Sequence, residues 1–168
     1  MLAPLNCESQ PGKAIAVLRD EINSELKEAM KSGDKRRVST LRMMNAAIKN
    51  GDIEARGQGK GALGDDAVAG LLQKMIKQRQ EAAELYDRGG RAELALGERE
   101  EIDIITDFLP QQMSDVEAGA AIAAIVHEIN AVGLKDMGRT MSALKEQFAG
   151  KMDFAKASAM VKKLLGGG

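Results

Sequence analysis

Side chains that commonly carry out nucleophilic, acid–base or metal chemistry are scarce in this sequence. The 168 residues include one histidine, His127, and one cysteine, Cys7. His127 is predicted to face away from Ile122, Ile125 and Ile129, on the exposed side of a helix. Cys7 is far in sequence from any base that could activate it. No phosphate-binding loop, dinucleotide fingerprint or zinc spacing is present, so we expect no catalytic residue, cofactor or metal.

Two arginines and two glutamates fall on helix faces that are otherwise apolar. Arg37 lies one turn before Leu41, and Arg79 lies within the apolar face of a later helix. Glu98 and Glu101 lie within the apolar face of the helix that follows. Because an unpaired buried charge is costly, we expect the two arginines to form structural ion pairs with the two glutamates. Two alternatives stay open: the side chains extend to water at the bundle edge, or they form a polar catalytic centre.

Other cations gather where the helices are predicted to face solvent. Lys35, Arg42 and Lys49 share one side of a helix, at intervals of about 10.5 Å. After Pro110, seven cations outnumber six acids. Such surfaces suit contacts with phosphate groups, but ordinary solvated helix faces have the same composition. The candidate nucleic-acid-binding residues are Lys35, Arg42, Lys49, Lys135, Arg139, Lys151, Lys156 and Lys163.

Helices are expected to position all of these residues. The chain has one tyrosine, three phenylalanines and no tryptophan, so strand-forming residues and rings for base stacking are few. Its ten methionines recur at helical spacing and are expected to fill the core. The Gly-rich stretch from Glu54 to Asp66 is predicted to be a mobile loop. Apolar periodicity predicts helices over about 13–31, 35–50, 66–88, 92–108, 115–132, 135–148 and 154–165.

The fold class is therefore predicted to be all-α, with an N-terminal bundle of about four helices and a smaller three-helix C-terminal domain. Residues 1–12 are expected to be a flexible tail, residues 13–110 the first domain and residues 111–168 the second. The boundary falls at Pro110, before the serine-x-x-glutamate capping box of Ser114 and Glu117. No stretch approaches the roughly 20 apolar residues of a membrane span. With one cysteine and no secretory signal, the protein is expected to be cytoplasmic.

Four stretches occur in an order typical of one family. They are RRVSTLRMMNAAIKNGDIEARG, LLQKMIKQRQEAAELYDRGGR, EREEIDIITDFLPQQMSDVE and GLKDMGRTMSALKEQFAG. On these motifs the chain resembles the YqeY-like proteins of the GatB/YqeY family, free-standing relatives of the tail domain of the B subunit of tRNA-dependent amidotransferases. The resemblance covers about residues 14–165.

The resemblance implies two helical domains and an association with tRNA. It also brings a family-level label, carbon–nitrogen ligase with glutamine as amido-N-donor, which we do not transfer to this chain. Relatives commonly have a Gly-Arg-Ala-Asp-Gly turn before the last helix, where this chain has Gly150-Lys151-Met152-Asp153-Phe154. Lysine contacts phosphate as a point charge, without the two-pronged geometry of arginine.

Three functions follow as hypotheses. The first is a non-catalytic, tRNA-associated accessory module. The second is an adaptor that binds a protein partner, for which methionine-rich surfaces are suited. The third is a glutamine-dependent carbon–nitrogen ligase.

Overall fold

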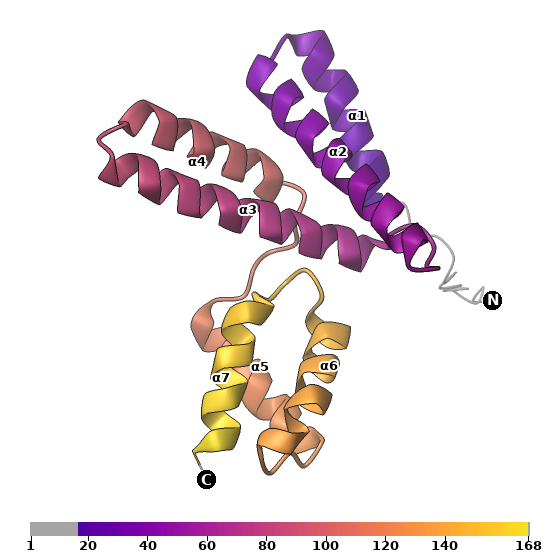
Figure 1. Ribbon diagram of the computed structural model, residues 1–168, viewed down its shortest axis with the longest axis vertical. Helices are drawn as coiled ribbons and strands as arrows, with labels where there is room; N and C mark the ends of the chain where they lie inside the picture. Colours follow the sequence, from indigo (N-terminus) through magenta and orange to yellow (C-terminus); the bar gives the residue numbers. More distant parts are fainter. Residues whose placement is uncertain (1–16, 168) are drawn as a thin grey trace, which may run out of the picture. The chain divides into compact units, whose positions relative to one another are not determined.

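The computed structural model describes residues 17–167, and these residues form helices and turns with no strand among them (Figure 1). The all-α prediction is therefore confirmed for the described part of the chain. The predicted tail of residues 1–12, including Cys7, lies outside it. The helices are α1 (Val17–Ser32), α2 (Lys35–Gly57), α3 (Asp65–Arg88), α4 (Ala92–Thr106), α5 (Asp115–Glu128), the short 3₁₀ helix η1 (Leu134–Asp136), α6 (Met137–Phe148) and α7 (Phe154–Gly166).

The chain divides into two compact units, and the division falls between Val68 and Ala69 near the start of α3. The boundary predicted near Pro110 lies inside the second unit. A separate C-terminal domain of residues 111–168 therefore stays a prediction. None of the helices within residues 17–167 combines the length and apolar character that crossing a bilayer requires.

The first unit is built on a helical hairpin of α1 and α2, which lie side by side (Figure 1). Gly33 adopts a left-handed φ of 76° in the turn, a conformation that costs glycine little. Asp34 then caps α2 by accepting a hydrogen bond from the Arg37 amide at 3.0 Å. Ile22 and Leu41 are fully buried, as the spacing of apolar residues predicts.

Helix α2 is about two turns longer than the sequence indicates. The helix was predicted to end near Asn50, before the Gly-rich stretch, but it continues through Gly51 to Gly57. A Cβ at Gly51 would lie 2.6 Å from Leu63 Cδ1, so the absence of a side chain lets the segment after α2 pack against the helix. The glycine here serves close packing, and the first part of the predicted mobile loop is helical.

In the second unit, α3 and α4 form another hairpin, which turns at Gly90 with φ 70°. The three helices α5, α6 and α7 enclose their own core. Helix α5 ends at Glu128, four residues before its predicted end, because Asn130 takes a left-handed φ of 52° and the Ala131 amide bonds back to the Val126 carbonyl at 3.0 Å. The core residues of this group are Ala118, Ile122, Ile125, Ala131, Leu144, Met152, Ala157, Val161 and Leu165.

Capping fixes where α5 and α7 begin. Ser114 and Glu117 form the predicted capping box, with side-chain bonds in both directions. Asp153 accepts hydrogen bonds from the amides of Ala155 and Lys156 at the start of α7. The sequence predicted the capping box, and it is confirmed.

Candidate anion-binding surfaces

The exposed side of α2 carries a row of cations that we call the basic ridge: Lys35, Arg42, Lys49 and Arg56. All four are exposed and follow one another at seven-residue intervals. Arg56 joins the row because α2 continues to Gly57, so the sequence analysis missed it. Four residues at this spacing span about 31 Å along the helix axis. The small and apolar side chains of Val38, Ser39, Met43 and Ala46 line a shallow depression beside Lys35 and Arg42.

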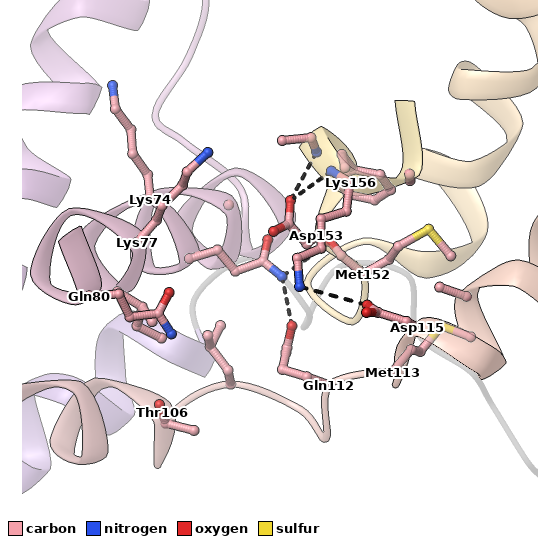
Figure 2. Close-up of a pocket in the computed structure, with 18 of the residues that line it drawn as sticks. Lys74, Lys77, Gln80, Thr106, Gln112, Met113, Asp115, Met152, Asp153 and Lys156 are labelled. Atoms are coloured by element: carbon pink, nitrogen blue, oxygen red, sulfur yellow. Dashed lines mark hydrogen bonds and ion pairs between the residues drawn. The ribbon is translucent and has the colours of Figure 1, made fainter. Parts of the chain in front are cut away.

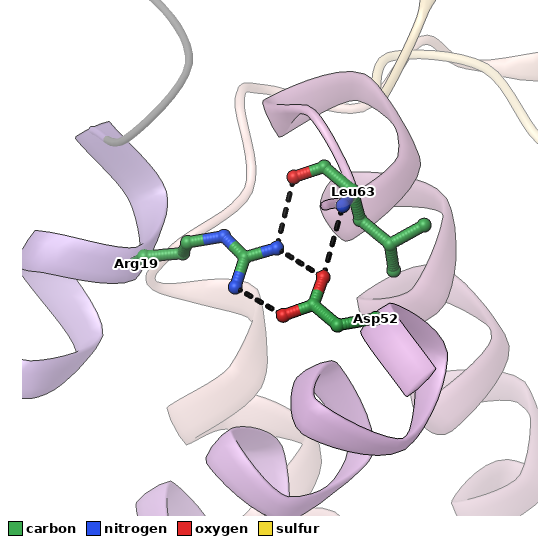
Figure 3. Close-up of polar contacts among 3 residues, drawn as sticks. All are labelled: Arg19, Asp52 and Leu63. Atoms are coloured by element: carbon green, nitrogen blue, oxygen red, sulfur yellow. Dashed lines mark hydrogen bonds and ion pairs between the residues drawn. The ribbon is translucent and has the colours of Figure 1, made fainter. Parts of the chain in front are cut away.

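Asp52, the aspartate of α2, is held by hydrogen bonds from α1 and from the segment after α2 (Figure 3). Asp52 accepts two hydrogen bonds from the guanidinium of Arg19 on α1, at 2.6 and 2.8 Å, and a third from the Leu63 amide at 2.9 Å. Arg19 also donates to the Leu63 carbonyl at 2.9 Å. The Arg19 bond, followed by the Leu63 amide, lowers the pKa of Asp52 from 3.8 to about 2. This network ties the segment after α2 to both helices of the hairpin.

The two arginines on apolar faces are both paired with glutamates. Arg79 Nε donates to Glu101 Oε2 at 2.8 Å, which joins α3 to α4 as the sequence analysis expected for this arginine. Arg37 is bonded at 2.8 Å to Glu25 of α1, a partner that the sequence analysis did not consider. Glu98 is half-buried on α4 and is the acceptor in neither of these bonds.

The second unit contains a cleft of about 550 Å³, which we call the lysine cleft (Figure 2). Lys74 and Lys77 line it from α3, one turn apart, and Lys156 lines it from α7. Apolar side chains of α3, α4, the segment after α4, the turn before α7 and α7 also line it, and we call them its floor. The floor includes Ile76, Ile102, Leu109, Met113, Met152, Phe154 and Met160.

A turn before α7 closes one side of the lysine cleft. Gly150 has a left-handed φ of 73°, and a Cβ there would lie 3.0 Å from Ala69 Cβ of α3. Gln112 holds this turn by donating to the Gly150 carbonyl at 2.6 Å, and it accepts from Gln73 of α3 at 2.9 Å. Lys151 belongs to the same turn, and its carbonyl accepts from the Met113 amide at 2.8 Å. The motif of Leu109 to Ser114 is therefore the link between α3 and the start of α7.

The predicted C-terminal cations are all exposed but differ in their surroundings. Arg139 donates to Asp136 at 2.9 Å, and Lys156 lies 3.7 Å from Asp115. Hydrogen bonds from the Val132 amide, and then from Arg139, lower the pKa of Asp136. The remaining three, Lys135, Lys151 and Lys163, occupy η1, the turn before α7 and the end of α7. His127 is exposed, as predicted.

Sequence reasoning missed Arg56, Lys74 and Lys77. Arg56 could have been found from its seven-residue spacing to Lys49, had the helix been extended. Lys77 lies in the stretch LLQKMIKQRQEAAELYDRGGR, on which the family resemblance partly rests, but the sequence analysis assigned this lysine no role. Asp52 and Arg19 gave no local signal, since they are 33 residues apart.

These features belong to a two-unit helical protein with basic surfaces. The profile of the YqeY-like family matches residues 19–165, and the chain belongs to that family.

Several curated fungal proteins are similar to it, and they carry the name "Altered inheritance of mitochondria protein 41, mitochondrial". The Lachancea thermotolerans protein is 29% identical over 147 residues, covering 84% of this chain and 75% of the relative. The Clavispora lusitaniae protein is 28% identical, with coverages of 73% and 70%. The Eremothecium gossypii protein is 29% identical, and the match spans 64% of this chain and only 58% of the relative. The predicted cytoplasmic location is contradicted by these relatives, which are named as mitochondrial proteins.

Proposed function

We propose that this protein is a non-catalytic, tRNA-associated binding module that contacts the phosphate backbone through the basic ridge of α2. The observation that carries this proposal is the row of four exposed cations at seven-residue intervals. The family resemblance to the tail of the amidotransferase B subunit supplies tRNA as the expected nucleic acid.

The geometry of the ridge suits a phosphate backbone better than a single anion. An α-helix drifts by about 20° for every seven residues, so the row winds gradually around α2. Successive charges lie about 10.5 Å apart, too far to converge on one phosphate group. The ridge would therefore meet several phosphates along a folded RNA. Such contacts give affinity that is independent of sequence and sensitive to salt.

Two acidic residues of the first unit are held by arginines that lie outside the ridge. Asp52 is bound by Arg19, and Glu25 is bound by Arg37. By contrast, the Arg79–Glu101 pair is only 13% and 21% exposed in its side chains, and its carboxylate is neutralised by the guanidinium. That arrangement suits a structural link between α3 and α4 better than proton transfer, which supports a binding role over a ligase.

The test is fluorescence anisotropy of labelled, folded tRNA titrated with the purified protein over a series of salt concentrations. Four phosphate contacts predict a slope of about −3 to −4 in a plot of log K against log salt. The variant Lys35→Ala/Arg42→Ala/Lys49→Ala should reduce the steepness of that slope by about 2 to 3.

The matched control is Lys27→Ala/Lys31→Ala/Lys60→Ala, which removes three exposed cations from the same unit but outside the ridge. This control variant should bind tRNA with nearly the affinity of the parent protein. Equal losses of tRNA affinity in the two variants would reject the ridge as the contact surface. Competition by heparin as effective as that by unlabelled tRNA would reject a preference for tRNA. Glutamine-dependent amidation by the purified chain alone would replace the proposal with the ligase.

A further inference from the structure

We infer that the lysine cleft is a docking site for an acidic amphipathic helix of a protein partner. The cleft lies wholly within the second unit and has no part in the basic ridge, so this inference adds a second binding surface. Its volume, about 550 Å³, is that of a small-molecule pocket (roughly 300–1,000 Å³), which is room for side chains from one face of a helix.

The floor of the cleft is apolar and deformable. Met113 and Met160 are half-buried and supply thioether side chains that adapt to the shape of an apolar partner, while Met152 belongs to the buried core. Gly119 leaves room for one of them, since a Cβ there would lie 3.3 Å from the terminal methyl of Met160. Phe154 is the only ring in the lining, which disfavours stacking of successive bases. Methionine-rich apolar grooves are typical acceptors of amphipathic helices.

The rim of the cleft is positive. Lys74 and Lys77 are exposed, and within residues 17–167 neither is part of an ion pair. Figure 2 shows both extending from α3, while Lys156 approaches Asp115 across the cleft. Asp115, at 3.7 Å, offsets the charge of Lys156, so the positive charge of the rim comes mainly from Lys74 and Lys77. The other carboxylate, Asp153, is occupied by the backbone amides at the start of α7.

The spacing of the two lysines at the rim favours an acidic helix over other acidic ligands. Lys74 and Lys77 are three residues apart, so their positions differ by about 4.5 Å along α3. Glutamates one turn apart on a partner helix have nearly the same spacing. Apolar residues between such glutamates would face the methionine floor. Charge complementarity at the rim and apolar burial at the floor thus define one kind of partner.

The probes are a panel of fluorescein-labelled helical peptides of about 16 residues, with leucine or isoleucine on one face and glutamates one turn apart at its edge. Peptides of the same composition in scrambled order are the reference, and anisotropy with the full chain is the measurement. Patterned peptides should bind at least about tenfold more tightly than scrambled ones. The variant Lys74→Glu/Lys77→Glu should weaken them by about tenfold or more.

Two controls separate this site from general charge effects. Lys145→Glu/Lys162→Glu reverses two exposed cations of the same unit outside the cleft and should change binding by less than about twofold. Gly70→Leu should weaken binding of the patterned peptides without changing the charge of the protein. Gly70 lines the cleft, and a Cβ added there would have no atom of residues 17–167 within 4 Å, so the new side chain would occupy space that the peptide needs.

The inference is overturned if no patterned peptide binds below millimolar concentration. It is also overturned if a single-stranded oligonucleotide of equal charge displaces the peptide as well as unlabelled peptide does. The ridge variant Lys35→Ala/Arg42→Ala/Lys49→Ala should retain peptide binding, so this test and the tRNA test can fail independently.

Discussion

A methyl group added at Gly150 should strongly destabilise the second unit. Gly150 combines two constraints: a left-handed φ of 73° and a close approach to α3. The left-handed conformation costs a non-glycine residue about 1–2 kcal/mol. The new Cβ would also lie 3.0 Å from Ala69 Cβ, whereas carbon atoms in contact prefer about 3.5–4.0 Å.

The second cost is substantial because neither atom can rotate away. Each Cβ is bonded directly to the backbone, so relief requires the turn to move from α3 by about 0.5–1 Å. Such overpacking typically costs about 1–3 kcal/mol. Gly150→Ala should therefore lower the free energy of unfolding by about 2–5 kcal/mol. Gly90→Ala has a similar φ of 70°, and its new Cβ would meet no atom of the described residues within 4 Å, so this variant should lose only about 1–2 kcal/mol.

Urea denaturation followed by far-ultraviolet circular dichroism gives both free energies. Hydrogen exchange adds a local measurement: the Met113 amide, which donates to the Lys151 carbonyl, should lose protection in Gly150→Ala. In an Ala69→Gly background the cost of Gly150→Ala should fall toward that of Gly90→Ala. Equal losses for Gly150→Ala and Gly90→Ala, with no coupling to Ala69, would refute the packing argument.

Three further outcomes follow from the polar contacts. The stability advantage of the parent over Asp52→Asn should be complete above about pH 4 and vanish as pH falls toward 2. The reason is that Arg19 lowers the pKa of Asp52 from 3.8 to about 2. Urea denaturation of both proteins at a series of acidic pH values measures this difference. Arg79→Met should cost about 1–3 kcal/mol in urea denaturation by stranding Glu101, and Arg79→Met/Glu101→Met should recover most of the loss. Ser114→Ala should cost about 1 kcal/mol and lower the thermal midpoint, while a loss near zero would show that the cap contributes nothing.

Several elements were predictable from local sequence because local physics decides them. Asp34, Ser114 and Asp153 cap the helices that follow them, and capping requires only a side-chain oxygen near the next three amides. The end of α2 was not predictable in this way. Gly51 has the low helix propensity that suggests an end, but contact with Leu63, 12 residues later, decides its role.

The two candidate sites likewise differ in whether local sequence or long-range packing reveals them. The seven-residue spacing of Lys35, Arg42 and Lys49 placed them together on α2, and the structure adds Arg56 through the longer helix. The lysine cleft could not be derived, because Lys74 and Lys156 come from helices whose proximity depends on long-range packing.

By itself, the sequence determined the helical class, most helix starts, the exposed cations and the family, because periodicity, capping and motifs are encoded over short distances. Only the tertiary structure decided that Arg37 meets Glu25, that Asp52 meets Arg19, and that the turn at Gly150 packs against α3. Those pairings depend on which helix faces meet, and facing is set by the packing of the whole unit. The residues next to a given side chain in sequence carry little information about which helix face it will meet.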